Sequence, residues 1–118
     1  MTAGVWDITI EQGSVFRLNL KYKDNLGAVI DLTGYTARMQ VRKSVKSNDI
    51  LLALTTENGG ITVGGAAGTI NIRAISEHTA LLTITSGVYD LELIPPSGED
   101  DAFRLLQGGV TVSPEVTR

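Results

Sequence analysis

The side chains most able to do chemistry are few along this chain of 118 residues. His78 is the only histidine and there is no cysteine, so the three or four nitrogen or sulfur ligands of a typical zinc site are missing. A Ser-His-Asp triad would need this same histidine, yet the sequence has no G-x-S-x-G motif, and Ser86 leads into an extended stretch. We therefore expect His78 to be a surface residue, and we expect no catalytic residues.

Two other segments suggest ligand binding only weakly. Glu99, Asp100 and Asp101 follow PPSG in one loop, but the alternating ligands and turn glycine of an EF-hand are missing. The glycine-rich run VGGAAG is followed by Thr69 and an extended stretch, whereas a phosphate-binding loop needs a lysine and then a helix. We expect a solvated turn and a hairpin turn here, and hence no metal and no cofactor.

Basic side chains recur at alternate positions in two stretches, SVFRLNLKYK and TARMQVRKSVK: Arg17, Lys21 and Lys23, then Arg38, Arg42, Lys43 and Lys46. If the two strands paired, these residues would form one cationic face. A protein that binds single-stranded nucleic acid also needs exposed aromatic residues between the charges, on which bases can stack. The alternation instead turns Phe16 and Tyr22 inward. The net charge of −3 has the wrong sign for a nucleic-acid partner. We expect a solvated face or a salt-bridging protein contact, and no nucleic acid.

Exposed aromatic rings would indicate sugar binding. Three are not assigned to the core by the alternation: Trp6, Tyr35 and Phe103. A carbohydrate-binding platform built from them stays open as an alternative.

Alternation with a period of two dominates the sequence and predicts strands. Seven are expected, at residues 6–10, 14–23, 35–42, 51–56, 69–75, 88–94 and 103–112. The fourth, LLALTT, is apolar on both faces, which predicts a strand covered twice or one at an interface. Turn sequences such as DNLG, DLTG and ENGG separate the strands, and Ser76 is placed to cap one short helix. The pattern predicts an all-β, immunoglobulin-like antiparallel β-sandwich of about seven strands with one short helix.

One detail favours the immunoglobulin-like form. SGVYDL places Gly87 two residues before Tyr89, on a strand that follows a short helical crossover, as in a tyrosine corner. We expect residues 1–118 to form a single domain without disulfides. The sequence has no basic start with an apolar run and no apolar stretch of about 20 residues, so we expect a soluble protein made in the cytoplasm, with no membrane partner.

Residues 6–44, WDITIEQGSVFRLNLKYKDNLGAVIDLTGYTARMQVRKS, resemble the opening of small virion proteins of tailed phages. They are similar to the immunoglobulin-like N-terminal domain of phage baseplate upper proteins, and SGVYDLEL and FRLLQGGVTVSPEVT extend the resemblance to about residue 117. It implies a structural, non-enzymatic protein of the virion, a tail or baseplate adaptor or a fibre-docking module, made in the host cytoplasm. Its partners would be other tail, baseplate or fibre proteins.

The expected mode of action is protein–protein assembly, as a symmetric homo-oligomer or docked on a symmetric ring. The residues that we expect to touch a partner are Trp6, Tyr35, Arg38 and Arg42. The alternatives are a carbohydrate-binding or adhesion domain, or a capsid-decoration subunit; an enzyme or a nucleic-acid protein fits the sequence less well.

Overall fold

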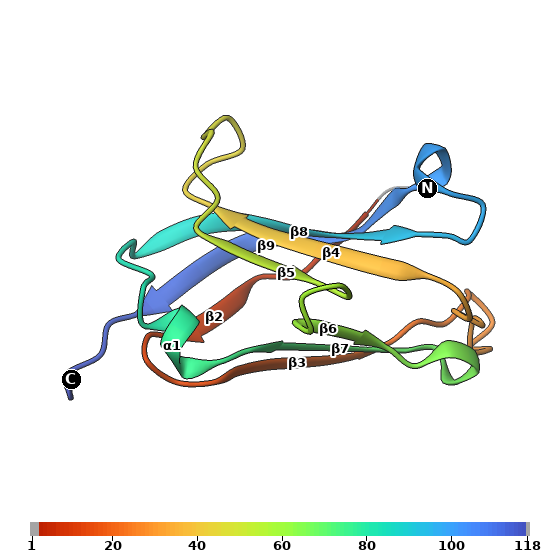
Figure 1. Cartoon of the computed structure of the whole chain (residues 1–118), viewed down its shortest axis with the longest axis horizontal. Helices are drawn as coiled ribbons and strands as arrows, with labels where there is room; N and C mark the ends of the chain where they lie inside the picture. Colours follow the sequence, from red (N-terminus) through yellow and green to blue (C-terminus); the bar gives the residue numbers. More distant parts are fainter. Residues whose placement is uncertain (1–2, 118) are drawn as a thin grey trace.

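The computed structural model describes residues 3–117, which form two sheets packed face to face. The larger sheet has the order β1-β9-β8-β4-β5, with β2 also paired to β9, and the smaller has the order β3-β7-β6 (Figure 1). The strands are β1 (Gly4–Val5), β2 (Ile8–Glu11), β3 (Phe16–Lys21), β4 (Thr36–Arg42), β5 (Leu52–Thr55), β6 (Ile61–Val63), β7 (Thr69–Ala74), β8 (Ser86–Ile94) and β9 (Phe103–Ser113). The prediction of an all-β sandwich is confirmed.

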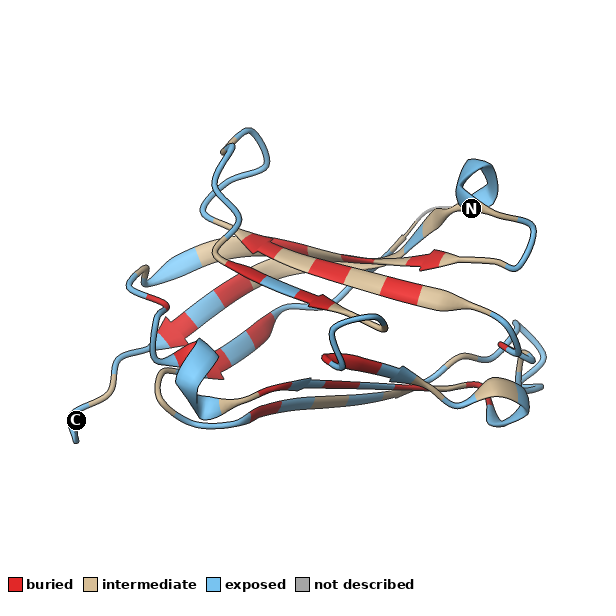
Figure 2. Ribbon diagram, in the orientation of Figure 1, coloured by how far each residue is buried: buried red, intermediate tan, exposed pale blue. Residues whose placement is uncertain are grey.

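The core lies between the two sheets and follows the alternation of the sequence. On β4, Ala37, Met39 and Val41 are buried, whereas the residues between them are half-exposed. The same alternation appears as bands along β4, β7 and β8 (Figure 2). A strand with one face in the core and one in water needs this pattern, so burial of apolar side chains fixes which face of each strand points inward.

The strands differ from the prediction in number and direction. The described residues form nine strands, because β1 and β6 were not predicted; the first predicted strand, residues 6–10, corresponds to β2, which a split at residues 6 and 7 separates from β1. The split occurs where the Asp7 carboxylate accepts a hydrogen bond from the Gly109 N–H (2.9 Å), a donor that would otherwise serve the ladder. The sandwich is not wholly antiparallel either, since β1 and β2 both run parallel to β9.

Of the two alternatives predicted for β5, coverage on both faces is wrong, and a place at an interface stays a prediction. Leu52 and Leu54 are buried, but Ala53 is exposed, and β5 forms an edge of the larger sheet. Thr56 N–H donates to Ala37 O (3.0 Å), so the backbone groups of Ala53 and Thr55 point away from β4. The apolar character of LLALTT therefore reflects one buried face next to an open edge.

The Asn58 side chain covers part of that edge. Its Oδ1 accepts hydrogen bonds from Thr55 N–H and Gly60 N–H, each at 2.9 Å, and its Nδ2 donates to Ala53 O at 3.0 Å. The amide thus takes the place of a neighbouring strand at β5. Edge strands that are blocked in this way are poor templates for further strand addition.

The short helix α1 (Ser76–Thr79) closes one end of the sandwich. Its N-cap is Ile75, not Ser76 as expected. Thr79 is completely buried; its hydroxyl donates to Ser14 O (2.8 Å) and accepts from Gly13 N–H (3.1 Å), which joins the helix to the turn between β2 and β3. Within residues 3–117, no helix has the length and apolar character needed to cross a membrane.

Candidate functional site

A concave surface lies on the outer face of the larger sheet. It is a groove of about 510 Å³ that crosses β4, β8 and β9. Its polar lining comes from positions that face away from the core: Arg38, Gln40, Arg42, Asp90, Glu92, Arg104 and Gln107. Val5 and Val45, which are both strongly exposed, add apolar surface to it.

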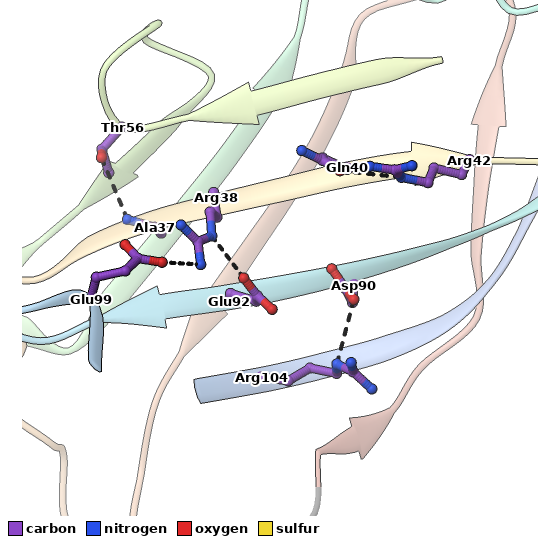
Figure 3. Close-up of polar contacts among 9 residues, drawn as sticks. All are labelled: Ala37, Arg38, Gln40, Arg42, Thr56, Asp90, Glu92, Glu99 and Arg104. Carbon is purple, nitrogen blue, oxygen red and sulfur yellow. Dashed lines mark hydrogen bonds and ion pairs between the residues drawn. The ribbon is translucent and has the colours of Figure 1, made fainter. Parts of the chain in front are cut away.

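Arg38 binds two carboxylates that come from different elements (Figure 3). Its Nε lies 2.7 Å from Oε1 of Glu92, which is directly opposite on β8. Its Nη2 lies 2.5 Å from Oε1 of Glu99, in the 3₁₀ turn η2 (Glu99–Asp101). The bonds to Glu99 and then Glu92 raise the pKa of Arg38, and they tie the loop before β9 to the groove.

A second ion pair lies one strand further along, between Arg104 Nε on β9 and Asp90 Oδ2 on β8 (3.4 Å). Arg104 also donates to Gln107 Oε1 (2.8 Å). Partial burial, followed by the nearby Glu92, raises the pKa of Asp90, although the surrounding arginines oppose this shift. Asp90 is therefore an acid whose charged form is disfavoured where it stands, a feature that is more frequent at binding sites than on ordinary surface.

Arg42 occupies the far end of β4 and binds no acid among the described residues. Its Nη2 donates to Gln40 Oε1 (2.9 Å), and its Nη1 donates to the Ser47 carbonyl (2.7 Å). The second bond holds the loop after β4, which carries Val45, beside the groove. The guanidinium is thus positioned by neutral acceptors and forms no ion pair with a described carboxylate.

Charges of both signs balance across this face. Three arginines (Arg38, Arg42 and Arg104) stand beside three carboxylates (Asp90, Glu92 and Glu99). Such a surface offers hydrogen bonds and ion pairs that can be exchanged for those of another protein, whereas phosphate backbone would require an excess of cations. Among the described residues, no group of three or more His, Cys, Asp or Glu side chains is arranged to hold a metal ion.

The four predicted contact residues fall in different places. Arg38 and Arg42 line the groove together. Trp6 does not line it; it lies between β1 and β2 with 59% of its surface exposed. Tyr35 does not line it either, and packs partly buried against the core.

The two basic stripes do not form one face, because β3 belongs to the smaller sheet and β4 to the larger. Tyr89 does not form the expected tyrosine corner, since its hydroxyl donates to the carbonyl of Trp6 (2.5 Å), 83 residues upstream. That bond instead fixes the N-terminal segment to β8. Burial, followed by the charge of Asp7, raises the pKa of Tyr89 to about 12.

Sequence reasoning missed the acids that complete the groove. The alternation of VYDLELI shows that Asp90 and Glu92 face outward. Only the register of β4 with β8 shows that Glu92 lies opposite Arg38. Glu99 was taken as part of a solvated turn, and its bond to Arg38 depends on how the loop folds back.

No protein-family model and no curated protein matches the chain.

Proposed function

We propose that this protein is a structural module of a tailed-phage virion, a tail or baseplate adaptor or a fibre-docking subunit, which docks through the outer face of its larger sheet. The observation that carries the proposal is the charge-balanced groove. Ion pairs with Glu92 and Glu99 fix the position of Arg38, and an ion pair with Asp90 fixes that of Arg104. A rigid sheet that presents preorganised charges of both signs suits contact with another protein.

The strand order supports an immunoglobulin-like form of the sandwich. In the nomenclature of that fold, β9-β8-β4-β5 corresponds to the order G-F-C-C′, and β3-β7-β6 corresponds to B-E-D. The atypical Tyr89 contact departs from the family pattern but leaves this order unchanged.

The virion assignment draws its support from the resemblance of IDLTGYTARMQVR and GVYDLEL to phage baseplate proteins. The first segment contains β4 and the second lies within β8, the strands that carry Arg38, Arg42, Asp90 and Glu92. In this proposal the protein is made in the host cytoplasm, is incorporated into the virion, and forms a symmetric homo-oligomer or docks on a symmetric ring.

The carbohydrate-binding alternative receives no support from the aromatic residues. Tyr35 and Phe103 pack against the core, and of the three candidate rings only Trp6 is largely exposed. A sugar platform needs two or three exposed rings, and these residues do not supply them.

The test is incorporation of variants into phage particles, with the chain quantified in purified virions by mass spectrometry. Arg38→Glu is expected to reduce incorporation strongly, because it inverts the charge at the centre of the groove. The double variant Arg38→Glu/Glu92→Arg restores an ion pair within the chain but leaves the surface inverted, so it should fold normally and still be excluded. Normal incorporation of the double variant, or absence of the wild-type chain from virions, would overturn the proposal.

A further inference from the structure

The smaller sheet ends in an open edge at β3. Among the described residues, β3 pairs with β7 alone, in a regular register of six residues from Phe16–Ala74 to Lys21–Thr69. The other outer strands are shorter: β6 has three residues and β2 four, and β5 is covered by Asn58. Strand β3 is therefore the longest uncovered edge in the described chain.

The register shows which backbone groups of β3 are available. Tyr22 N–H donates to Gly68 O (2.8 Å), and hydrogen-bonded and non-hydrogen-bonded pairs alternate along an antiparallel ladder. The N–H and C=O groups of Arg17, Asn19 and Lys21 therefore point away from β7. They have no hydrogen-bond partner in the described residues. Three donors and three acceptors are thus arrayed along one straight edge.

The core is incomplete beside this edge. Leu18 and Leu20 pack against the core but are only partly buried, whereas their partners on β7, Ile72 and Ile70, are 1% and 0% exposed. The inner face is thus better covered at β7 than at β3. An additional strand beside β3 would cover Leu18 and Leu20 with its own apolar side chains.

The outer face of the same sheet is cationic. Arg17 and Arg73 stand opposite each other, Lys21 lies four residue pairs further along on the same face, and all three are exposed. No Asp or Glu occurs on β3, β6 or β7, and none of these three cations forms an ion pair with a described residue. A strand added at β3 would meet this charge along its own outer face.

The charge pattern also decides which strand fits. A second copy that added through its own β3, antiparallel about Asn19, would place Arg17 opposite the Lys21 of its neighbour. Like charges directly opposite each other destabilise a strand pair. A strand with Asp or Glu at the outward positions would gain cross-strand ion pairs at the same places.

We infer that β3 accepts an extended strand from a different polypeptide, in which acidic residues alternate with aliphatic ones. The aliphatic side chains cover Leu18 and Leu20, the acidic side chains face Arg17 and Lys21, and the backbone bonds to the free groups of Arg17, Asn19 and Lys21. This inference rests on the proposed function, in which the protein acts by assembly with other proteins. It adds a second docking surface, on the sheet opposite the groove.

The test uses fluorescein-labelled peptides of about eight residues, the length of a typical strand. One alternates glutamate with valine, and the other alternates lysine with valine. Fluorescence anisotropy should show binding of the glutamate peptide only, and hydrogen exchange followed by NMR should show slower exchange at the amides of Arg17, Asn19 and Lys21. Binding without protection of these amides, no binding at all, or equal binding of a single-stranded DNA oligonucleotide would contradict the inference.

Variants separate the edge from general charge effects. Arg17→Glu/Lys21→Glu should weaken binding of the glutamate peptide by about tenfold or more and should create binding of the lysine peptide. The control variant Lys43→Glu/Lys46→Glu makes the same change in net charge, but in the loop that follows β4 of the larger sheet. It should leave binding of the glutamate peptide unchanged. Asn19→Pro removes one outward N–H without removing a bond to β7, so it should abolish binding while the domain stays folded.

The outcomes also distinguish this inference from the proposed function. If neither peptide binds but Arg38→Glu lowers incorporation into virions, the groove proposal stands and the β3 inference fails. If the glutamate peptide binds at β3 but the chain is missing from virions, the virion proposal fails and the strand-accepting edge remains.

Discussion

Replacing Asn58 with alanine should destabilise the domain and open the edge at β5. The side chain makes three hydrogen bonds, to Thr55 N–H, Gly60 N–H and Ala53 O. Two of these bonds are solvent-exposed and the one from Gly60 N–H is partly buried, so water replaces part of what is lost, and about 0.5 kcal/mol for each bond is appropriate. The loss in free energy of unfolding is then about 1.5 kcal/mol, which lowers Tm by about 6 °C for a domain of this size.

The assay is calorimetry for stability, combined with light scattering for self-association. Asn58→Ala should also increase self-association, because Ala53 and Thr55 then present unsatisfied backbone groups at the edge of the larger sheet. The matched control is Asn48→Ala, since Asn48 is exposed and its side chain makes no hydrogen bond with any residue in the range 3–117. If both variants melt at the same temperature and remain equally monodisperse, the role given to Asn58 is refuted.

Three further changes test other parts of the account. Thr79→Val leaves the partly buried Gly13 N–H without its acceptor and should cost about 2 to 4 kcal/mol in free energy of unfolding. Thr79→Ser keeps the hydroxyl and should cost about 1 kcal/mol, as measured by denaturant unfolding. Burial raises the pKa of Tyr89 to about 12, above the value of 10.0 in an unfolded chain, so the unfolded chain loses this proton first. The contribution of Tyr89 to the free energy of unfolding is therefore complete below pH 10 and should be lost as the pH rises from 10 towards about 12. Unfolding curves of Tyr89→Phe at alkaline pH should lack this loss. Burial and then Glu92 raise the pKa of Asp90, so its charged form opposes folding above that pKa; Asp90→Asn should unfold at higher denaturant than wild type at neutral pH but not at about pH 3.

The alternation of the sequence was sufficient to predict four of the longer strands. β3, β4, β7 and β8 combine clear period-two patterns with flanking turn sequences, so local information defines them. β6 is different because it has three residues directly after a glycine pair, too few for alternation to be seen. It becomes a strand only because β7 lies beside it.

The interruption between β1 and β2 depends on contacts that are distant in sequence. The Asp7 carboxylate reaches Gly109, and a Cβ at Gly108 would lie 2.2 Å from Trp6 O, so the close approach requires glycine on β9. Nothing in residues 4–11 alone signals this. The parallel pairing with β9 likewise follows from the whole topology and not from a local pattern.

The candidate site was predictable only in part. Arg38 and Arg42 could be identified as outward residues of one strand, and they do line the groove. Their acidic neighbours required the register of β4 with β8 and the fold of the loop that carries Glu99. The separation of the two basic stripes also depends on sheet assignment, because each strand alone shows only which side of it faces water.

The central claim is that the outer face of the larger sheet docks on another virion protein. The most direct measurement is a cryo-electron microscopy map of the phage particle at a resolution that places side chains. The account predicts symmetric copies of this chain in the tail or baseplate, with Arg38 and Arg104 buried against a neighbouring subunit. A map in which the chain is missing, or in which this face is open to solvent in every copy, would contradict it.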